Sequence, residues 1–233
     1  MNLLDILMIL IIVAFMILGY KRGVIKTTVK LFGIIVIGIL AYTLKTPLAG
    51  FLIKHLPFYN FGGKVDGLYS LNILFYNSLS FLFIFIMLYS LLNILILVAG
   101  FLDKMLKATI ILYLPDKILG AIVGFIEGVI VSFVIMFVLI QLPFFNDLTS
   151  KSKYTLNILN RTPIIRIVLA PTTKSVEGIQ AIIKKADLAD DSSKEEANIG
   201  ILNELIRYGV ISSTDVQKLI DDNKLRLDKV KFN

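Results

Sequence analysis

Apolar residues gather into four long runs along the chain, separated by shorter polar or broken segments. The runs cover residues 3–20, 26–44, 71–102 and 118–142. About 20 predominantly apolar residues in a helix cross the hydrocarbon core of a bilayer, so the pattern predicts four transmembrane helices. The predicted fold is therefore all-α, an integral membrane bundle of four helices in residues 1–142. The third run is longer than a bilayer needs, which a tilt or an emerging end accommodates.

The segments between these runs differ in character. Residues 45–70 contain two prolines, four glycines and several aromatic residues, and predict a loop that lies on the membrane interface or folds back onto the helices. Residues 103–115 predict an amphipathic connector that stops at Pro115.

Beyond Pro143 the composition changes. Residues 143–183 predict an amphipathic interfacial segment, in which "TPIIRIVLAP", too short to span a membrane, forms a short helix between Pro163 and Pro171. Residues 184–233 predict a polar linker, "KKADLADDSSKEEANIG", followed by a small helical hairpin around Gly209. The hairpin would pair two apolar faces, made by Ile201, Leu202, Leu205, Val216, Leu219 and Ile220. Ser212, three residues before Asp215, predicts a helix N-cap.

Composition supports the membrane class and excludes several kinds of chemistry. Hydrophobic residues make up 57% of the 233 residues, mean hydropathy is +0.83, and cysteine is absent. Without cysteine the chain has no disulfide, thiol nucleophile or zinc-thiolate site. A single histidine, His55, cannot form a histidine cluster, and no soluble catalytic motif occurs. We therefore expect a protein that is not an enzyme and that needs no metal or cofactor.

Charge is distributed unevenly. The chain carries a net +7, but residues 1–183 hold fifteen of the 24 basic and seven of the 17 acidic residues, which leaves −1 for residues 184–233. Because the basic residues flank the apolar runs, they indicate contact with anionic lipid head groups rather than nucleic acid. The first and third connections hold seven lysines and arginines against three in residues 45–70. The positive-inside rule then places both termini outside the cytoplasm.

A ladder of small residues marks the fourth run. Gly120, Gly124, Gly128 and Ser132 are spaced four apart, so they drift slowly round one helix face. Small residues let helix backbones approach closely in lipid, and Gly33, Gly38 and Ala41 of the second run are the expected facing surface. Packing within one bundle is the favoured interpretation, and a homodimer interface or a pore-lining face are the alternatives.

Glu127 lies near the middle of the same run. An ionised carboxylate at the bilayer centre costs about 2.5–3.5 kcal/mol on insertion scales, so it must be neutral, paired or facing water. One hypothesis is a neutral acid hydrogen-bonded to Asn77, Asn93 or Gln141 of a neighbouring helix. The other is a proton relay or ion site, the usual role of an intramembrane acid.

Two stretches resemble the colicin V production protein (CvpA) family over residues 3–142. "LDILMILIIVAFMILGYKRGVIKTTVKLFGIIVIGILAY" is similar to its opening, and "DKILGAIVGFIEGVIVSF" is similar to its fourth-helix signature. The resemblance implies a four-helix protein of the bacterial cytoplasmic membrane, linked to colicin V production and envelope phenotypes. Some members carry a serine protease after the fourth helix, but residues 143–233 contain no histidine for such a triad.

The expected function is a non-enzymatic scaffold or accessory in colicin V-type toxin production and export, or in envelope homeostasis. Its partners would be the lipid bilayer and either another protein or a second copy of the chain. The alternative is a channel or proton-coupled transporter that uses Glu127.

Overall fold

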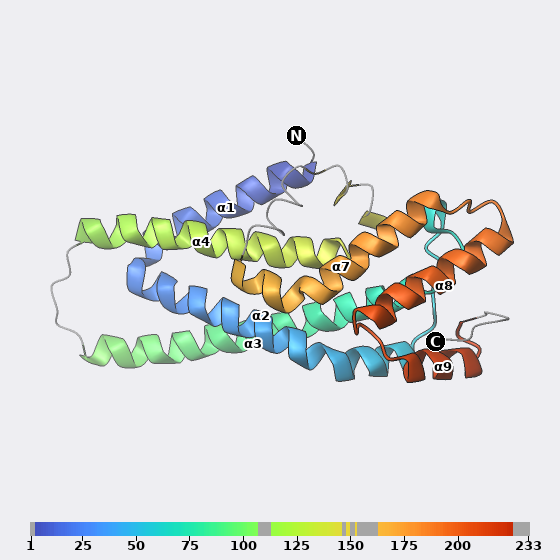
Figure 1. Ribbon diagram of the computed structural model, residues 1–233. Coiled ribbons are helices and arrows are strands. Elements are labelled where there is room, and N and C mark those ends of the chain that lie inside the picture. The colour runs from blue at the N-terminus through green and yellow to red at the C-terminus, as the bar shows by residue number, and fades with distance from the viewer. Residues whose placement is uncertain (1–2, 107–112, 146–147, 150–151, 153–162, 226–233) are drawn as a thin grey trace.

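The computed structural model describes residues 3–106, 113–145, 148–149, 152 and 163–225, and every regular element in them is a helix. The predicted all-α class is confirmed (Figure 1). The described helices are α1 (Leu3–Arg22), α2 (Val24–His55), α3 (Leu71–Leu106), α4 (Tyr113–Leu139), α7 (Pro163–Lys185), α8 (Asp191–Arg207) and α9 (Ser213–Asp221), with 3-10 turns at Gly63–Val65 and Pro143–Phe145.

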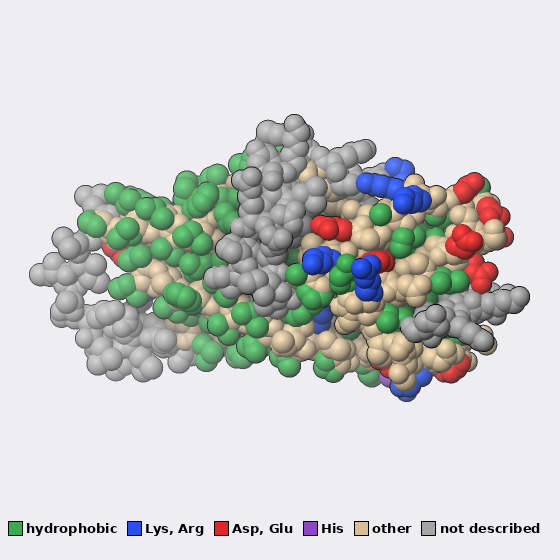
Figure 2. All heavy atoms as spheres, in the orientation of Figure 1, with side chains coloured by type: hydrophobic (Ala, Val, Ile, Leu, Met, Phe, Trp, Pro, Cys, Tyr) green, Lys and Arg blue, Asp and Glu red, His purple; other side chains and the backbone are tan. Residues whose placement is uncertain are grey.

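Helices α1 to α4 are each long and apolar enough to cross a membrane. α1 packs against α4, and α2 packs against both α3 and α4. Large apolar side chains face outward, such as Phe32 at 64% exposed and Phe83 at 61%, as lipid-facing surfaces require. Hydrophobic side chains cover this part of the molecule, whereas charged side chains gather around the C-terminal helices (Figure 2).

α2 is much longer than the predicted span over residues 26–44, and the expected loop from residue 45 is wrong in its first part. The helix continues to His55 and passes through Pro47. Lys45, Ala49 and Ile53 are all buried at a spacing of four, which is the periodicity of a helix face. The C-terminal part of α2, from residue 45 to His55, therefore extends the helix beyond the length that a bilayer requires.

α7 also differs from its prediction. Instead of a short helix between two prolines, one helix runs from Pro163 through Pro171 to Lys185. Pro163 suits the first helical position, where an amide hydrogen would have no partner. Thr172, Val176 and Ile179 are buried on one face, and the Thr172 hydroxyl lies 3.2 Å from the Tyr42 hydroxyl of α2. This face of α7 packs on protein, against α2 and α8.

The predicted polar linker over residues 184–200 is largely wrong, because its second half is helical. α8 begins at Asp191, and the Asp190 carboxylate accepts a hydrogen bond from the Ser193 amide at 3.0 Å as its N-cap. The polar composition is that of a capped helix start with an acidic first turn rather than that of a linker. The predicted cap at Ser212 is present, accepting from the Asp215 amide at 3.0 Å.

Five of the six apolar residues of the expected hairpin are buried and Ile220 is half-buried, and α8 also docks on the turn that precedes α3. Ile201, Leu202 and Leu205 are fully buried. Asn198 accepts from the Ser70 amide and donates to the Gly67 carbonyl, both at 2.9 Å. We call α7, α8, α9 and the residues up to 225 the C-terminal unit. It lies against the extension of α2 and the start of α3 (Figure 1).

A lysine fixes the other end of the C-terminal unit. Lys224 donates to the carbonyls of Ile53, at 2.8 Å, and Leu56, at 3.0 Å, and also to that of Lys54. These are carbonyls at the end of α2, where a cation complements the helix dipole and the unpaired acceptors. The C-terminal unit is therefore fixed to the bundle at both ends, by Asn198 and by Lys224. Of the predicted connector over 103–115, residues 107–112 lie outside the described residues.

Asn198→Ala is expected to loosen this docking. The change leaves the buried Ser70 amide without its acceptor, which costs roughly 1–3 kcal/mol. Hydrogen exchange in detergent should show faster exchange across α8 and the Gly67–Ser70 turn. Asn203→Ala, on the exposed face of the same helix, is the matched control. Equal exchange in the two variants would contradict this account of the docking.

Candidate functional site

The glycine ladder of α4 lies against α1. A Cβ atom added to Gly124 would come within 3.0 Å of the Gly19 Cα and would also meet the Phe15 carbonyl oxygen. A Cβ on Gly120 would meet Gly23, and one on Gly128 would lie 2.9 Å from the Ile12 Cα. The two helices run antiparallel with their backbones in contact, and only glycine leaves room for this. We call this contact the α1–α4 seam.

The expected partner surface on the second helix is wrong. Gly33 faces the Leu92 side chain of α3, and a Cβ on Gly38 would meet no atom within 4 Å. The close approach is made instead by α1, whose Gly19 offers backbone opposite the ladder. Ser132 continues the ladder and is fully buried, with no hydrogen-bond partner for its hydroxyl among the described residues.

The turn between α1 and α2 is held by α4. Gly23 takes a positive φ of 85°, which lets the chain reverse directly after Arg22. The Asp116 carboxylate accepts from the Val24 amide at 3.0 Å, at the N-terminus of α2. Lys117 donates to the Lys21 carbonyl at 2.8 Å, at the end of α1. Both ends of the turn therefore have a charged cap supplied by the same helix.

Glu127 pairs with Arg22 inside the bundle. Its Oε2 lies 3.5 Å from Arg22 Nη1; the Glu127 side chain is 0% exposed and that of Arg22 is 24% exposed. Gly124 packs at the level of Phe15, so the Arg22 backbone lies about two turns nearer the membrane surface than Glu127, and its side chain reaches inward. The second carboxylate oxygen, Oε1, has no hydrogen-bond partner among the described residues.

None of the three amides predicted as partners bonds to Glu127. Asn77 and Gln141 donate to the carbonyls four residues before them, at 2.9 Å and 2.7 Å. Asn93 does the same with Tyr89 at 2.8 Å and accepts from Lys30 Nζ at 2.8 Å. The carboxylate is thus paired with a cation, and each of the three amide nitrogens donates to a carbonyl of its own helix.

We call Arg22, Lys30, Asn93 and Glu127 the intramembrane cluster. It draws on all four spanning helices and holds two cations for one carboxylate. Its arrangement can lock helices together or exchange a proton, but it contains no nucleophile. In the described residues no group of three or more His, Asp or Glu side chains is placed to hold a metal ion.

Sequence reasoning missed a second buried cation. Lys45 of α2 is 4% exposed, and its Nζ lies 4.3 Å from the centre of the Tyr42 ring and 5.9 Å from that of Phe137. Cation–π contact of this kind compensates part of the cost of burial. The signal in the sequence was the helical spacing of Lys45 with Ala49 and Ile53, which the loop prediction set aside.

These observations define the class of the chain as a multi-pass membrane protein with a helical unit packed on one end of its bundle. Residues 4–162 match the family model described as "Colicin V production protein", so the chain belongs to that family. The match covers the four spanning helices and ends before α7. No curated protein and no solved structure matches the chain.

Proposed function

We propose that the protein is a non-enzymatic scaffold or accessory of the colicin V production type, acting in toxin production and export or in envelope homeostasis. The observation that carries this proposal is the way Glu127 is held. Its Oε2 faces Arg22 at 3.5 Å beside a seam where two backbones touch, and the side chain is fully buried. An acid so enclosed joins helices, and the exposed surface of the C-terminal unit is left to contact a protein partner or a second copy.

A channel or proton-coupled transporter is the second candidate. It is favoured by Glu127 Oε1, which has no hydrogen-bond partner among the described residues, and by Lys30, whose ammonium lies near enough to interact electrostatically with that carboxylate. Ionisable residues inside a membrane commonly mark ion or proton pathways. A transport cycle would require Glu127 to exchange its proton with water.

Glu127→Gln separates the two candidates. Glutamine keeps the shape and hydrogen-bonding capacity but carries no exchangeable charge, so a scaffold should keep its phenotype in cells at unchanged protein level. Wild-type protein in liposomes should show no more proton or ion flux than empty vesicles, and Glu177→Gln on exposed α7 serves as the control. Flux in the wild type that Glu127→Gln abolishes would establish transport instead.

We further propose that the protein lies in the bacterial cytoplasmic membrane with both termini outside the cytoplasm. The start of α1 and the C-terminal unit lie at the same end of the spanning bundle (Figure 1). Four basic residues lie at the opposite end, in the first connection and the start of α2: Lys21, Arg22, Lys26 and Lys30. Basic residues next to spans favour the cytoplasm, which supports this orientation.

A cysteine at Ser192 is expected to react with a membrane-impermeant thiol reagent in intact cells. Ser192 is exposed in the first turn of α8, and the chain has no other cysteine to compete. Lys21→Cys, at the other end of the bundle, should be labelled only after lysis. The reverse pattern would invert the proposed topology.

A further inference from the structure

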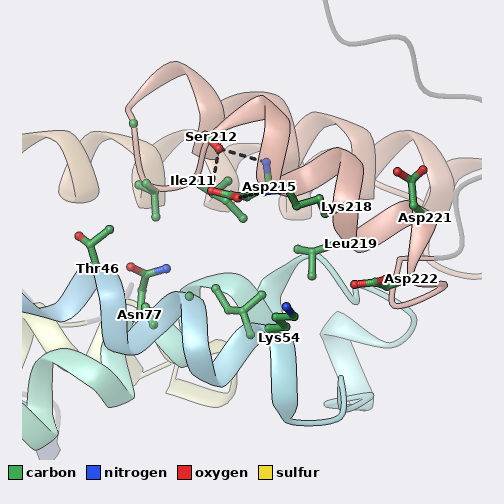
Figure 3. A pocket seen from close by; sticks show the side chains of 15 residues that line it. Thr46, Lys54, Asn77, Ile211, Ser212, Asp215, Lys218, Leu219, Asp221 and Asp222 are labelled. Carbon is green, nitrogen blue, oxygen red and sulfur yellow. Dashed lines mark hydrogen bonds and ion pairs between the residues drawn. The ribbon is translucent and has the colours of Figure 1, made fainter.

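A cavity separates the extension of α2 from the last two helices of the C-terminal unit. Its volume is about 810 Å³, within the usual range of small-molecule sites. One wall is α2 from Thr46 to Lys54, and the facing wall is α9 with the α8–α9 turn (Figure 3). The family match ends at residue 162, so nine of the fifteen residues that line this cavity belong to the part of the chain beyond the match.

The cavity begins where the lipid-facing surface of α2 ends. Val36 and Ile39 face outward from the spanning part of α2, at 54% and 37% exposed. Continuing along the helix at intervals of three and four residues, the same stripe reaches Thr46, Gly50 and Lys54, which line the cavity. A molecule lying along this stripe in the bilayer therefore has a continuous path into the cavity.

Polarity changes along the cavity. Thr46 and Asn77 lie at one end, and Lys54 and Asp222 lie at the other (Figure 3). Asn77 is 3% exposed, lines the cavity, and donates its amide nitrogen to the Ile73 carbonyl at 2.9 Å, which leaves its amide oxygen as the acceptor that faces this end. Between the two ends the floor is apolar, made by buried Ala49, Ile53 and Leu219.

The outer end offers both signs of charge. Lys218 is already paired with Asp215 at 3.4 Å, and Gln217 donates to Asp221 at 3.1 Å. Lys54 and Asp222 have no ion-pair partner within 4.0 Å in the part of the chain that the structure describes, and beyond that distance Asp222 interacts electrostatically with the ammonium of Lys224. A head group that satisfies both must carry an anion and a cation.

Dimensions also favour a lipid raised from its leaflet. The eight helical rises from Thr46 to Lys54 span about 12 Å, whereas the head-group layer of one leaflet is about 5–8 Å thick. A head group that reaches Lys54 therefore brings the upper part of its acyl chains against the apolar floor. A soluble zwitterion without acyl chains would make no apolar contact with this floor.

We infer that the cavity binds one zwitterionic phospholipid of the phosphoethanolamine class, which enters sideways from the adjoining leaflet. Its phosphate meets Lys54, its ammonium meets Asp222, and its ester region meets Thr46 and Asn77. This inference does not depend on whether the bundle acts as a scaffold or as a transporter.

Tryptophan quenching tests the proposal, because the chain contains no tryptophan. Ile211→Trp places one reporter on the cavity wall, and Asn203→Trp places another on the exposed face of α8. The protein is assembled in lipid nanodiscs that contain phosphatidylethanolamine brominated in the upper acyl chain. We expect strong quenching of the Ile211→Trp signal and little quenching of the Asn203→Trp signal.

Gly50→Leu supplies the blocking variant. A Cβ at Gly50 would meet no atom within 4 Å, so a leucine side chain can occupy the cavity without a clash with other residues. Leucine also has a higher helix propensity than glycine. Quenching at Ile211→Trp should then be lost while circular dichroism and melting stay unchanged. Quenching that persists in this folded variant, or is absent from the start, overturns the inference.

Head-group exchange tests the charge pairing. When brominated phosphatidylethanolamine and phosphatidylglycerol compete for the site, the site should bind phosphatidylethanolamine more tightly. Asp222→Asn should reduce this ratio of affinities roughly tenfold, as expected for the loss of one charge-assisted hydrogen bond. Asp191→Asn, an exposed acid outside the cavity, should leave it unchanged. Equal quenching by both lipids in the unmodified site would overturn the zwitterionic assignment.

Discussion

Gly124→Leu is expected to break the α1–α4 seam. A leucine side chain cannot fit where even a Cβ atom would meet the Phe15 carbonyl and lie 3.0 Å from the Gly19 Cα. The obstacle is backbone rather than the end of a flexible side chain, so the helices must separate. We expect a loss of more than about 3 kcal/mol, beyond the usual range for overpacking a core. Thermal unfolding in detergent, followed by circular dichroism, measures it.

The chain offers a matched control within the same bundle. Gly38→Leu makes the same change in a spanning helix, but its Cβ would meet no atom within 4 Å. It should unfold at the wild-type temperature or slightly above it, since leucine favours helix over glycine. Gly19→Leu, on the opposite side of the seam, should reproduce the defect of Gly124→Leu. If Gly38→Leu and Gly124→Leu were equally stable, the ladder would not be a tight contact.

The number and type of the spanning helices could be predicted because lipid imposes a simple requirement. A run of about 20 apolar residues must satisfy its own backbone, which only a helix does within one segment. The same reasoning failed beyond the bilayer. Residues 45–55 are helical because Ala49 and Ile53 pack against protein. The sequence predicted a loop there because the prolines and glycines of the segment were given more weight than the helical spacing of its apolar residues.

The C-terminal unit was harder to place for a related reason. Its hairpin faces followed from apolar spacing, and Ile201, Leu202 and Leu205 are buried as that spacing indicates. Its docking rests on Asn198 and Lys224, two polar side chains that bond to backbone groups far away in the sequence. A polar residue carries no pattern that reveals such a partner, so the cavity beside α2 could not be predicted either.

The candidate site was half predictable. Glu127 stood out by its cost in lipid, but Arg22 was missed because it ends its helix and was counted with the basic flank. The ladder held the missing clue: Gly120, Gly124 and Glu127 are spaced four and three apart and so share one face of α4. Once α1 is known to lie on that face, the cation that ends α1 is within reach of the acid.

Arg22→Gln is expected to destabilise the bundle through the acid that it leaves behind. Removing one partner of a buried ion pair costs about 3–5 kcal/mol in proteins, because the other charge stays buried without compensation. Here the loss should fall at the lower end, since Arg22 is 24% exposed and the carboxyl group is able to take up a proton. Glu127→Gln alone should cost less, because its freed arginine can extend toward the membrane surface.

The combination of both changes decides whether the pair is a lock. With Arg22→Gln and Glu127→Gln together no charge is left unpaired, so stability should recover most of what Arg22→Gln loses, and the double-mutant cycle should give a coupling of at least about 1 kcal/mol. Lys26 is an exposed cation of α2, four residues after Arg22 in the sequence, and Lys26→Gln should show no coupling with Glu127→Gln. Additive losses from Arg22→Gln and Glu127→Gln would mean that the two side chains are neighbours without a stabilising interaction.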